Sequence, residues 1–245
     1  MESPNTCCKM KTIADLINPK TRGRNTICLN MVVHDETDQT INVIDTVAPY
    51  VDQMVIVQDG LNYPAIRRAC EKHDGTYISA PYSGGWPELH RRLALAMTYT
   101  DWVFVIDSDE MPTEKLLMEL RRLVNTNLWA YKINWRQYNN GVFVFENSAT
   151  RLFRLLPELT WSMVGHSGPT QLSYIRTIAP NEQLDIHHHH NTDDDELRTD
   201  RNVYFVEQMM QRWGYIPAVC LHAKAIAKGN PKAEKEFLRC VTSKT

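Results

Sequence analysis

The feature that most constrains the fold is a set of four short apolar runs, each followed by a segment with helical periodicity. The runs cover residues 26–33, 53–60, 76–79 and 102–106, and the helical segments cover 34–50, a stretch from about Pro64, 88–97 and 113–124. Nearly continuous apolar runs are typical of parallel strands that are covered on both faces. Their alternation with helices predicts an α/β fold with a mostly parallel central sheet flanked by helices.

The second half of the chain has a different pattern. Three strand-like segments follow one another, at 128–134, 141–145 and 150–156. The sequence Asn139-Asn140-Gly141 before the second of them is typical of a hairpin turn. Helical signals return from Asp193 onward. We therefore expect three parts: a lead-in at 1–24, one domain at 25–192 and a helical C-terminal extension at 193–245.

The bulk composition excludes several classes of protein. The chain has 245 residues, a hydrophobic content of 43% and a formal net charge of −2, which argues against a large non-specific nucleic-acid surface. A lysine-rich stretch at 224–235 nevertheless keeps a nucleic-acid acceptor open. Six scattered cysteines without a CxxC pair favour free thiols. Because no apolar run is long enough to span a membrane and residues 1–25 lack a signal-peptide core, we expect a cytoplasmic protein, with peripheral membrane contact left open.

Acidic residues follow three of the predicted strands. Asp35 and Glu36 follow the first strand, Asp59 the second, and Asp107 and Asp109 the fourth. Ligands of open α/β sheets bind outside the carboxyl ends of the strands, so these acids are expected to share one edge. Two carboxylates spaced by one residue favour a hard cation, Mg²⁺ or Mn²⁺. The alternative is an ordinary solvated turn that caps the helix at 113–124.

The order of these segments resembles a known enzyme family. The stretches "ICLNMVVHDE", "PYVDQMVIVQDG" and "SGGWPELHRRLALAMTYTDWVFVIDSDE" are similar to the nucleotide-sugar domain of family 2 glycosyltransferases, the inverting GT-A type. The segments "TRLFRLLPELTWSMVGHSGP" and "IHHHHNTDDDELRTDRNVYFVEQM" extend the resemblance to about Met210, closest to the bacterial lipopolysaccharide-core branch. The resemblance implies a nucleotide-sugar half at about 25–124 and an acceptor half at about 125–192.

The resemblance also implies how a donor binds. Asp35 and Glu36 would border the nucleotide pocket, and Asp59, followed by Gly60, would contact the base. The remaining implied donor contacts are Trp86 beside the diphosphate, Arg91 on the base or diphosphate, and Asp107 towards the ribose.

For the metal, the resemblance implies Asp109 as direct ligand of Mn²⁺ or Mg²⁺, with Asp107 nearby and His188 as a third ligand or diphosphate contact. His188 lies in the run "HHHH" at 187–190, whose alternation as a strand would send His188 and His190 to one side. The alternative is a solvated polar stretch.

An inverting transfer needs a base within reach of the acceptor hydroxyl. The family's His-Glu pair is His166-Ser167 here, so His166 is the leading candidate and Glu110 its rival. The resemblance thus implies a metal-dependent inverting glycosyltransferase, with a hexosyltransferase favoured, that uses a UDP-sugar and a hydroxyl on a glycan, a lipid-linked molecule or another acceptor. Two alternatives stay open: a nucleotidyltransferase, although no glycine-rich phosphate loop is present, and a catalytically silent sugar-nucleotide-binding protein.

Overall fold

The computed structural model describes residues 25–34, 37–83, 87–161, 168–170 and 172–190. The predicted lead-in at 1–24 and the predicted helical extension at 193–245 lie outside the described residues. No helix in these ranges is long and apolar enough to cross a membrane.

The first part of the described chain alternates strands with helices. Its elements are β1 (Ile27–Val33), α2 (Thr37–Val47), the 3₁₀ turn η2 (Ala48–Tyr50), β2 (Gln53–Asp59), α3 (Pro64–Lys72), β3 (Thr76–Ala80), α4 (Pro87–Ala96), β4 (Trp102–Val105), β5 (Glu110–Pro112) and α5 (Glu114–Val124). The second part consists of β6 (Ala130–Asn139), β7 (Val142–Arg154), β8 (Ile175–Thr177), the 3₁₀ turn η3 (Pro180–Glu182) and β9 (Asp185–His190).

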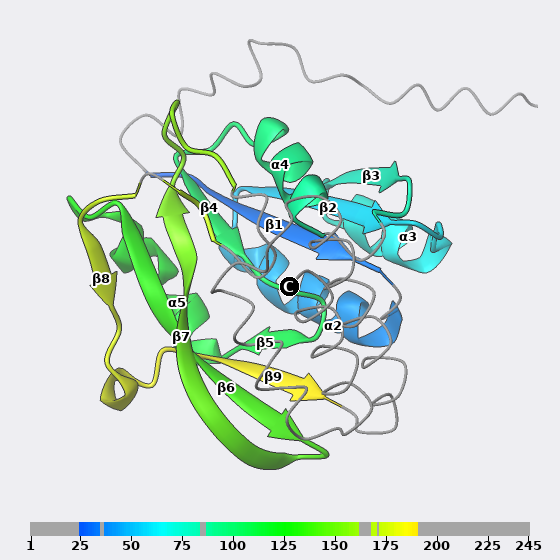
Figure 1. The fold of residues 1–245 in the computed structure, drawn as a ribbon. Coiled ribbons are helices and arrows are strands. Elements are labelled where there is room, and N and C mark those ends of the chain that lie inside the picture. Colours follow the sequence, from blue (N-terminus) through cyan, green and yellow to red (C-terminus); the bar gives the residue numbers. More distant parts are fainter. Residues whose placement is uncertain (1–24, 35–36, 84–86, 162–167, 171, 191–245) are drawn as a thin grey trace, which may run out of the picture.

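The strands form one curved sheet in the order β3-β2-β1-β4-β7-β6-β9-β5, with β8 beside β6 (Figure 1). β1 pairs in parallel with both β2 and β4, and β2 pairs in parallel with β3. β7 joins β4 and β6 in antiparallel fashion, whereas β9 lies parallel to β6. The prediction of a mainly parallel α/β sheet flanked by helices is confirmed.

Alternation of side chains along β1 divides the core into two layers. Ile27, Leu29 and Met31 pack in the layer that contains the apolar faces of α2, α3 and α5. Cys28 packs on the opposite face, in the layer that contains Ala94 of α4. Because both faces are covered, the strand reads as a continuous apolar run. The same arrangement directs the carboxyl ends of β1, β2 and β4 to one edge of the sheet.

The strands of the second half differ from the predicted ones. The two expected strands at 141–145 and 150–156 are one long strand, β7, because it pairs with β6 along its length through two register shifts. Residues 110–112, for which the sequence predicted no strand, form the short strand β5 because β9 pairs with them in antiparallel fashion. Sequence periodicity cannot reveal either feature, since both depend on a partner strand distant in sequence.

Helix α5 begins at a side-chain cap that also connects it to β9. The hydroxyl of Thr113 accepts a hydrogen bond from the amide of Leu116 at 3.3 Å and another from the amide of Asp185 at 3.4 Å. The amide of Thr113 donates in turn to the carbonyl oxygen of Asp185 at 2.9 Å. The cap thus fixes the position of β9 relative to the segment that follows β4.

We expect the substitution Thr113→Ala to lower the free energy of unfolding by about 1 kcal/mol, because an alanine leaves the first turn of α5 without its cap. Urea denaturation followed by circular dichroism measures this change. Thr113→Ser keeps the hydroxyl and is the matched control, expected to retain most of the stability. Equal losses in the two variants would show that the methyl group, and not the cap, carries the effect.

Candidate functional site

The turn after β4 is organised by the carboxylate of Glu110. The amide of Asp107 donates to Glu110 Oε2 at 2.9 Å, and the amide of Glu110 donates to the carbonyl oxygen of Asp107 at 3.0 Å. The indole N–H of Trp135 donates to Glu110 Oε1 at 2.8 Å. Glu110 is only 1% exposed. Its buried carboxylate therefore bonds the backbone at the start of the turn and fixes the position of Asp107.

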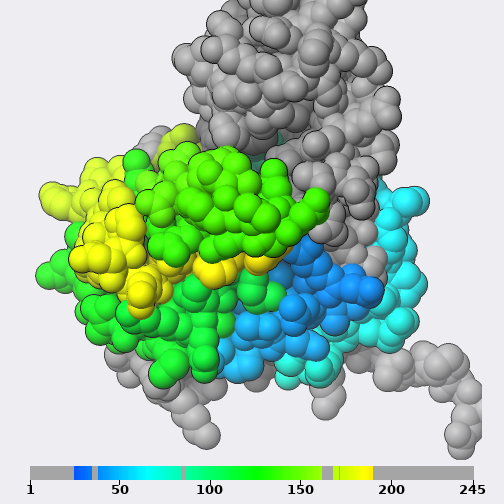
Figure 2. Space-filling model, turned by 90° about the horizontal axis from the view of Figure 1, so that it is seen from below, coloured from blue at the N-terminus to red at the C-terminus, as the bar shows by residue number. Residues whose placement is uncertain are grey.

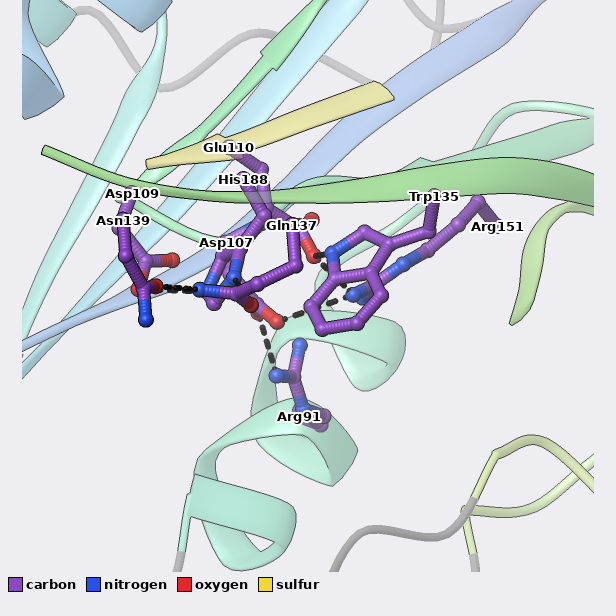
Figure 3. A network of polar contacts seen from close by, with 9 residues as sticks. All are labelled: Arg91, Asp107, Asp109, Glu110, Trp135, Gln137, Asn139, Arg151 and His188. Carbon is purple, nitrogen blue, oxygen red and sulfur yellow. Dashed lines mark hydrogen bonds and ion pairs between the residues drawn. The ribbon is translucent and has the colours of Figure 1, made fainter. Parts of the chain in front are cut away.

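Two arginines from different parts of the chain hold the carboxylate of Asp107. Arg91 of α4 donates to Asp107 Oδ1, and Arg151 of β7 donates to Asp107 Oδ2 at 3.2 Å (Figure 3). Arg151 also forms an ion pair with Glu110. The two cations balance the charge of the buried acids, which would otherwise be costly to remove from water.

These charges set the protonation of the cluster. Burial alone would raise the pKa of Asp107, but Arg91 and Arg151 outweigh it and hold that pKa well below its usual range. For Glu110 burial dominates: it raises the pKa to about 7 against the lowering effect of Arg151, and the charges of Asp107 and Asp109 act in the same direction as burial. The two arginines thus favour the ionised form of Asp107.

The side chain of Asp109 faces His188 of β9. Asp109 Oδ2 lies 2.8 Å from His188 Nε2, and His188 Nδ1 lies 2.6 Å from Gln137 Oε1 (Figure 3). Because an amide oxygen can only accept, Nδ1 carries a proton and donates it to Gln137. Nε2 and the Asp109 carboxylate, 2.8 Å apart, must then have a proton or a cation between them, since two lone pairs would repel at that distance. This pair can share a cation.

The pairing of β6 with β9 explains why His188, among four consecutive histidines, reaches this place. Gln137 and His188 are partners in the parallel register, and the ring of Trp135 packs on His188 with centroids 4.6 Å apart. His187 and His189 lie on the other face, with ring centroids 5.1 Å and 5.3 Å from Tyr138. The expected strand alternation in the histidine run is confirmed for these three residues.

Among the described residues, no group of three or more His, Cys, Asp or Glu side chains is arranged to hold a metal ion. If a cation binds here, Asp109 and His188 are the described side chains that would hold it. Such a small set suits Mg²⁺ or Mn²⁺, which typically bind one or two carboxylates together with waters and substrate phosphates.

A second polar cluster surrounds Asp59 at the end of β2. Its carboxylate accepts hydrogen bonds from the amide and the hydroxyl of Ser83, both at 2.6 Å, and lies 3.0 Å from His90 Nε2. Asp59 is 3% exposed. The next residue, Gly60, has a φ of +97°, a conformation that other residues rarely adopt. In this structure Asp59 stabilises the loop after β3, and its predicted contact with a base stays a prediction.

The structure brings five of the predicted site residues into one cluster: Arg91, Asp107, Asp109, Glu110 and His188. Asp59 and Gly60 lie in the second cluster. Four predicted residues, Asp35, Glu36, Trp86 and His166, lie outside the described residues.

Sequence reasoning missed Gln137 and Arg151. It considered Trp135 only as an aromatic that could stack on a sugar, and not as a donor to Glu110. Arg151 belongs to the "TRLFR" segment that carries the family resemblance, so an arginine next to apolar Leu152 and Phe153 was a usable signal of a buried anion nearby. Trp135 and Gln137 gave no such signal, because their roles follow from the register of β6 with β9.

Comparisons with known proteins bear on the fold. No protein-family model and no curated protein matches the chain. A crystal structure of S. aureus TarS 1-349 in complex with UDP-GlcNAc superposes with a TM-score of 0.55 at 12% identity, over 88% of this chain and 81% of that one. A second structure of TarS 1-349 gives 0.52 at 12% identity, over 90% and 72%. In a longer TarS structure, the match at 11% identity and a TM-score of 0.53 covers 88% of this chain and 43% of that one.

At this level of identity the likeness concerns the fold alone. The chain has a GT-A-like α/β fold, shared with glycosyltransferase structures, as the sequence predicted. The narrower assignment to the lipopolysaccharide-core branch is not confirmed.

We expect Arg151→Met to lower the free energy of unfolding by about 3 kcal/mol, because it leaves the buried carboxylate of Glu110, next to the partly exposed one of Asp107, without its cation. Chemical denaturation measures this loss. Arg176→Met is the matched control: Arg176 is 42% exposed and pairs with Glu182 at the surface, so its loss should stay within about 1 kcal/mol.

The double variant Arg151→Met/Glu110→Gln should recover part of the loss, since it removes the carboxylate that Arg151 neutralises. Strictly additive losses in the double variant would mean that the ion pair does not stabilise the turn.

Proposed function

We propose that the protein is a metal-dependent inverting glycosyltransferase that moves a sugar, favoured to be a hexose, from a UDP-sugar to an acceptor hydroxyl. The observation that carries this proposal is the pair formed by Asp109 and His188 beside ionised Asp107, at the carboxyl edge of a GT-A-like sheet. The TarS structure with this fold in complex with UDP-GlcNAc supports a UDP-sugar as donor.

In this proposal Asp109 and His188 bind Mn²⁺ or Mg²⁺. Their oxygen and nitrogen atoms lie 2.8 Å apart, and the hydrogen bond from His188 Nδ1 to Gln137 fixes the tautomer that a ligand needs. Both oxygens of Asp107 are already paired with arginines, which favours Asp109 as the direct ligand. When bound, the ion supplies positive charge for the leaving diphosphate.

The arginines have a positioning role in this proposal. Arg91 and Arg151 hold the Asp107 carboxylate from opposite elements, α4 and β7, and keep it ionised for a ribose hydroxyl or the ion. They are placed before substrate arrives, so no reorganisation is needed during the reaction.

Of the two predicted bases, Glu110 is disfavoured by its position. A base must reach the acceptor hydroxyl, whereas Glu110 is 1% exposed and bound by Arg151, Trp135 and the amide of Asp107. His166, outside the described residues, stays the predicted base.

We expect UDP to bind the metal-free protein weakly and at least tenfold more tightly with Mn²⁺, and Asp109→Asn to abolish this gain, because the amide has no charge for the ion. Isothermal titration calorimetry measures both affinities. Asp74→Asn is the matched control: Asp74 lies in the turn before β3, at the opposite edge of the sheet, and its φ of +56° suits asparagine. Equal affinity for UDP with and without Mn²⁺ would contradict the proposed metal dependence of donor binding.

We expect Gln137→Leu to lower the affinity for Mn²⁺ at fixed UDP about 10-fold to 100-fold, since His188 loses the acceptor that orients its ring. Gln137→Glu keeps an oxygen opposite Nδ1 and should retain most of the effect. Titration of Mn²⁺ at fixed UDP compares the two. If both variants behave like the parent, Gln137 does not position His188 for a cation.

A further inference from the structure

Trp161, in the segment between β7 and β8, is buried, with only 3% of its surface exposed. It packs with Val103 and Val105 of β4, the strand that leads to Asp107. It also pairs with Pro169 in an isolated antiparallel bridge. A ring that is enclosed in this way cannot stack on a substrate, so any part it has in the candidate site must act through its neighbours.

Two successive arginines of α4 contact Trp161. The guanidinium carbon of Arg91 lies over the indole ring, 5.3 Å from the ring centroid, and Arg92 Nε donates to the carbonyl oxygen of Trp161 at 2.8 Å. Trp161 belongs to the later part of the chain and α4 to the earlier part. Figure 2 shows these parts side by side, the first strands and helices in blue and cyan and the later strands in green and yellow. The two contacts therefore fix α4 to the later part at two points.

The hydrogen bond between Arg91 and Asp107 does not by itself fix the arginine. Arg91 donates to Asp107 through Nη2 alone, whereas its Nη1 is buried without a hydrogen-bond partner among the described residues. A guanidinium that uses two nitrogens on one carboxylate has a fixed plane, but a single bond leaves that plane free to turn. The face of an aromatic ring attracts the flat cation and restricts its plane. The ring of Trp161 therefore supplies the constraint that the single bond lacks.

The indole N–H of Trp161 takes no part in this contact. Its Nε1 is buried without a hydrogen-bond partner in the described part of the chain, so a phenylalanine here would keep a ring face and lose no such bond. A leucine would keep apolar volume and lose the ring. Trp161 and Arg91 also line a cavity of about 10 Å³, room for one water-sized group. An oxygen atom bound there by the two N–H groups is the competing explanation, and the two substitutions separate it from a role of the ring.

We propose that Trp161 is a positioning residue whose ring holds the Arg91 guanidinium against the Asp107 carboxylate. The same ring packs on β4, so one side chain fixes both the arginine and the strand that leads to the acid. The consequence for donor binding rests on the proposed function: a UDP-sugar and its ion meet Asp107 already in place, because Arg91 cannot turn away. Without the ring, part of the binding free energy is lost in ordering Arg91.

The test compares Trp161→Leu and Trp161→Phe in the full chain, each alone and in an Arg91→Met background, by calorimetric titration of UDP with saturating Mn²⁺. Trp161→Leu should lower the affinity for UDP about fivefold to tenfold, the scale of one cation–π contact, and Trp161→Phe should retain most of the affinity. In the Arg91→Met background Trp161→Leu should have no further effect, because no guanidinium is left to position.

Trp102→Leu is the matched control. Trp102 is also fully buried, its Nε1 likewise has no hydrogen-bond partner among the described residues, and Arg154 lies over its ring at 4.8 Å. It differs in position, since it begins β4 and Asp107 follows the other end of that strand. The control should leave the affinity for UDP unchanged at temperatures where circular dichroism shows a folded protein, and Trp102→Phe replaces it if it does not fold.

Equal losses of affinity from Trp161→Leu in both backgrounds would show a purely structural role and overturn the proposal. A loss from Trp161→Phe as large as that from Trp161→Leu would also overturn it and assign the role to the indole N–H. A parent that does not bind UDP with Mn²⁺ contradicts the proposed function instead. The same variants are then compared by urea denaturation, which also serves for any variant too unstable to titrate. Trp161→Leu should lower the midpoint less in the Arg91→Met background than in the parent, and equal shifts overturn the positioning of Arg91.

Discussion

The contact on which the rest of the site depends is the bridge from Arg151 to Asp107 and Glu110. Arg151 comes from the long strand β7, whereas the two acids come from the turn after β4. One guanidinium therefore joins the two halves of the sheet at the place where the chemistry is expected. Buried carboxylates without that cation would be neutralised or would force the turn open. The ionised Asp107 and the closed turn both follow from this bridge.

The second determinant is the register of β9. It pairs in parallel with β6 and in antiparallel fashion with the short β5. This double pairing places His188 opposite Gln137 on one side and opposite Glu110 on the other. A shift by one residue would turn His187 or His189 towards Asp109 and change every contact of the ring. The Thr113 cap, bonded to Asp185, helps to prevent such a shift.

The two halves of the sheet contribute different side chains to the candidate site. The parallel half, with β1, β2 and β4, supplies the acids at its carboxyl edge, the usual ligand position in such sheets. The antiparallel half supplies Arg151, Trp135 and Gln137, and its hairpin extends from the ring of Trp135 out to the exposed tip. The site lies where the halves meet. In the proposed function, the donor binds to the parallel half and the acceptor to the antiparallel half.

The sequence by itself determined the alternation of strands and helices, the edge that carries the acids and the identity of Asp107, Asp109 and His188 as candidates. The alternation and the acidic edge follow from apolar periodicity and residue spacing, which do not depend on distant partners, whereas His188 became a candidate through the family resemblance. Only the tertiary structure decided that Arg151 neutralises the acids, that Glu110 is enclosed, that Asp59 holds a loop and that β7 is one continuous strand. Each of these follows from pairing between segments far apart in the chain, and a pairing register is set by packing of the whole sheet, which no short stretch of sequence contains.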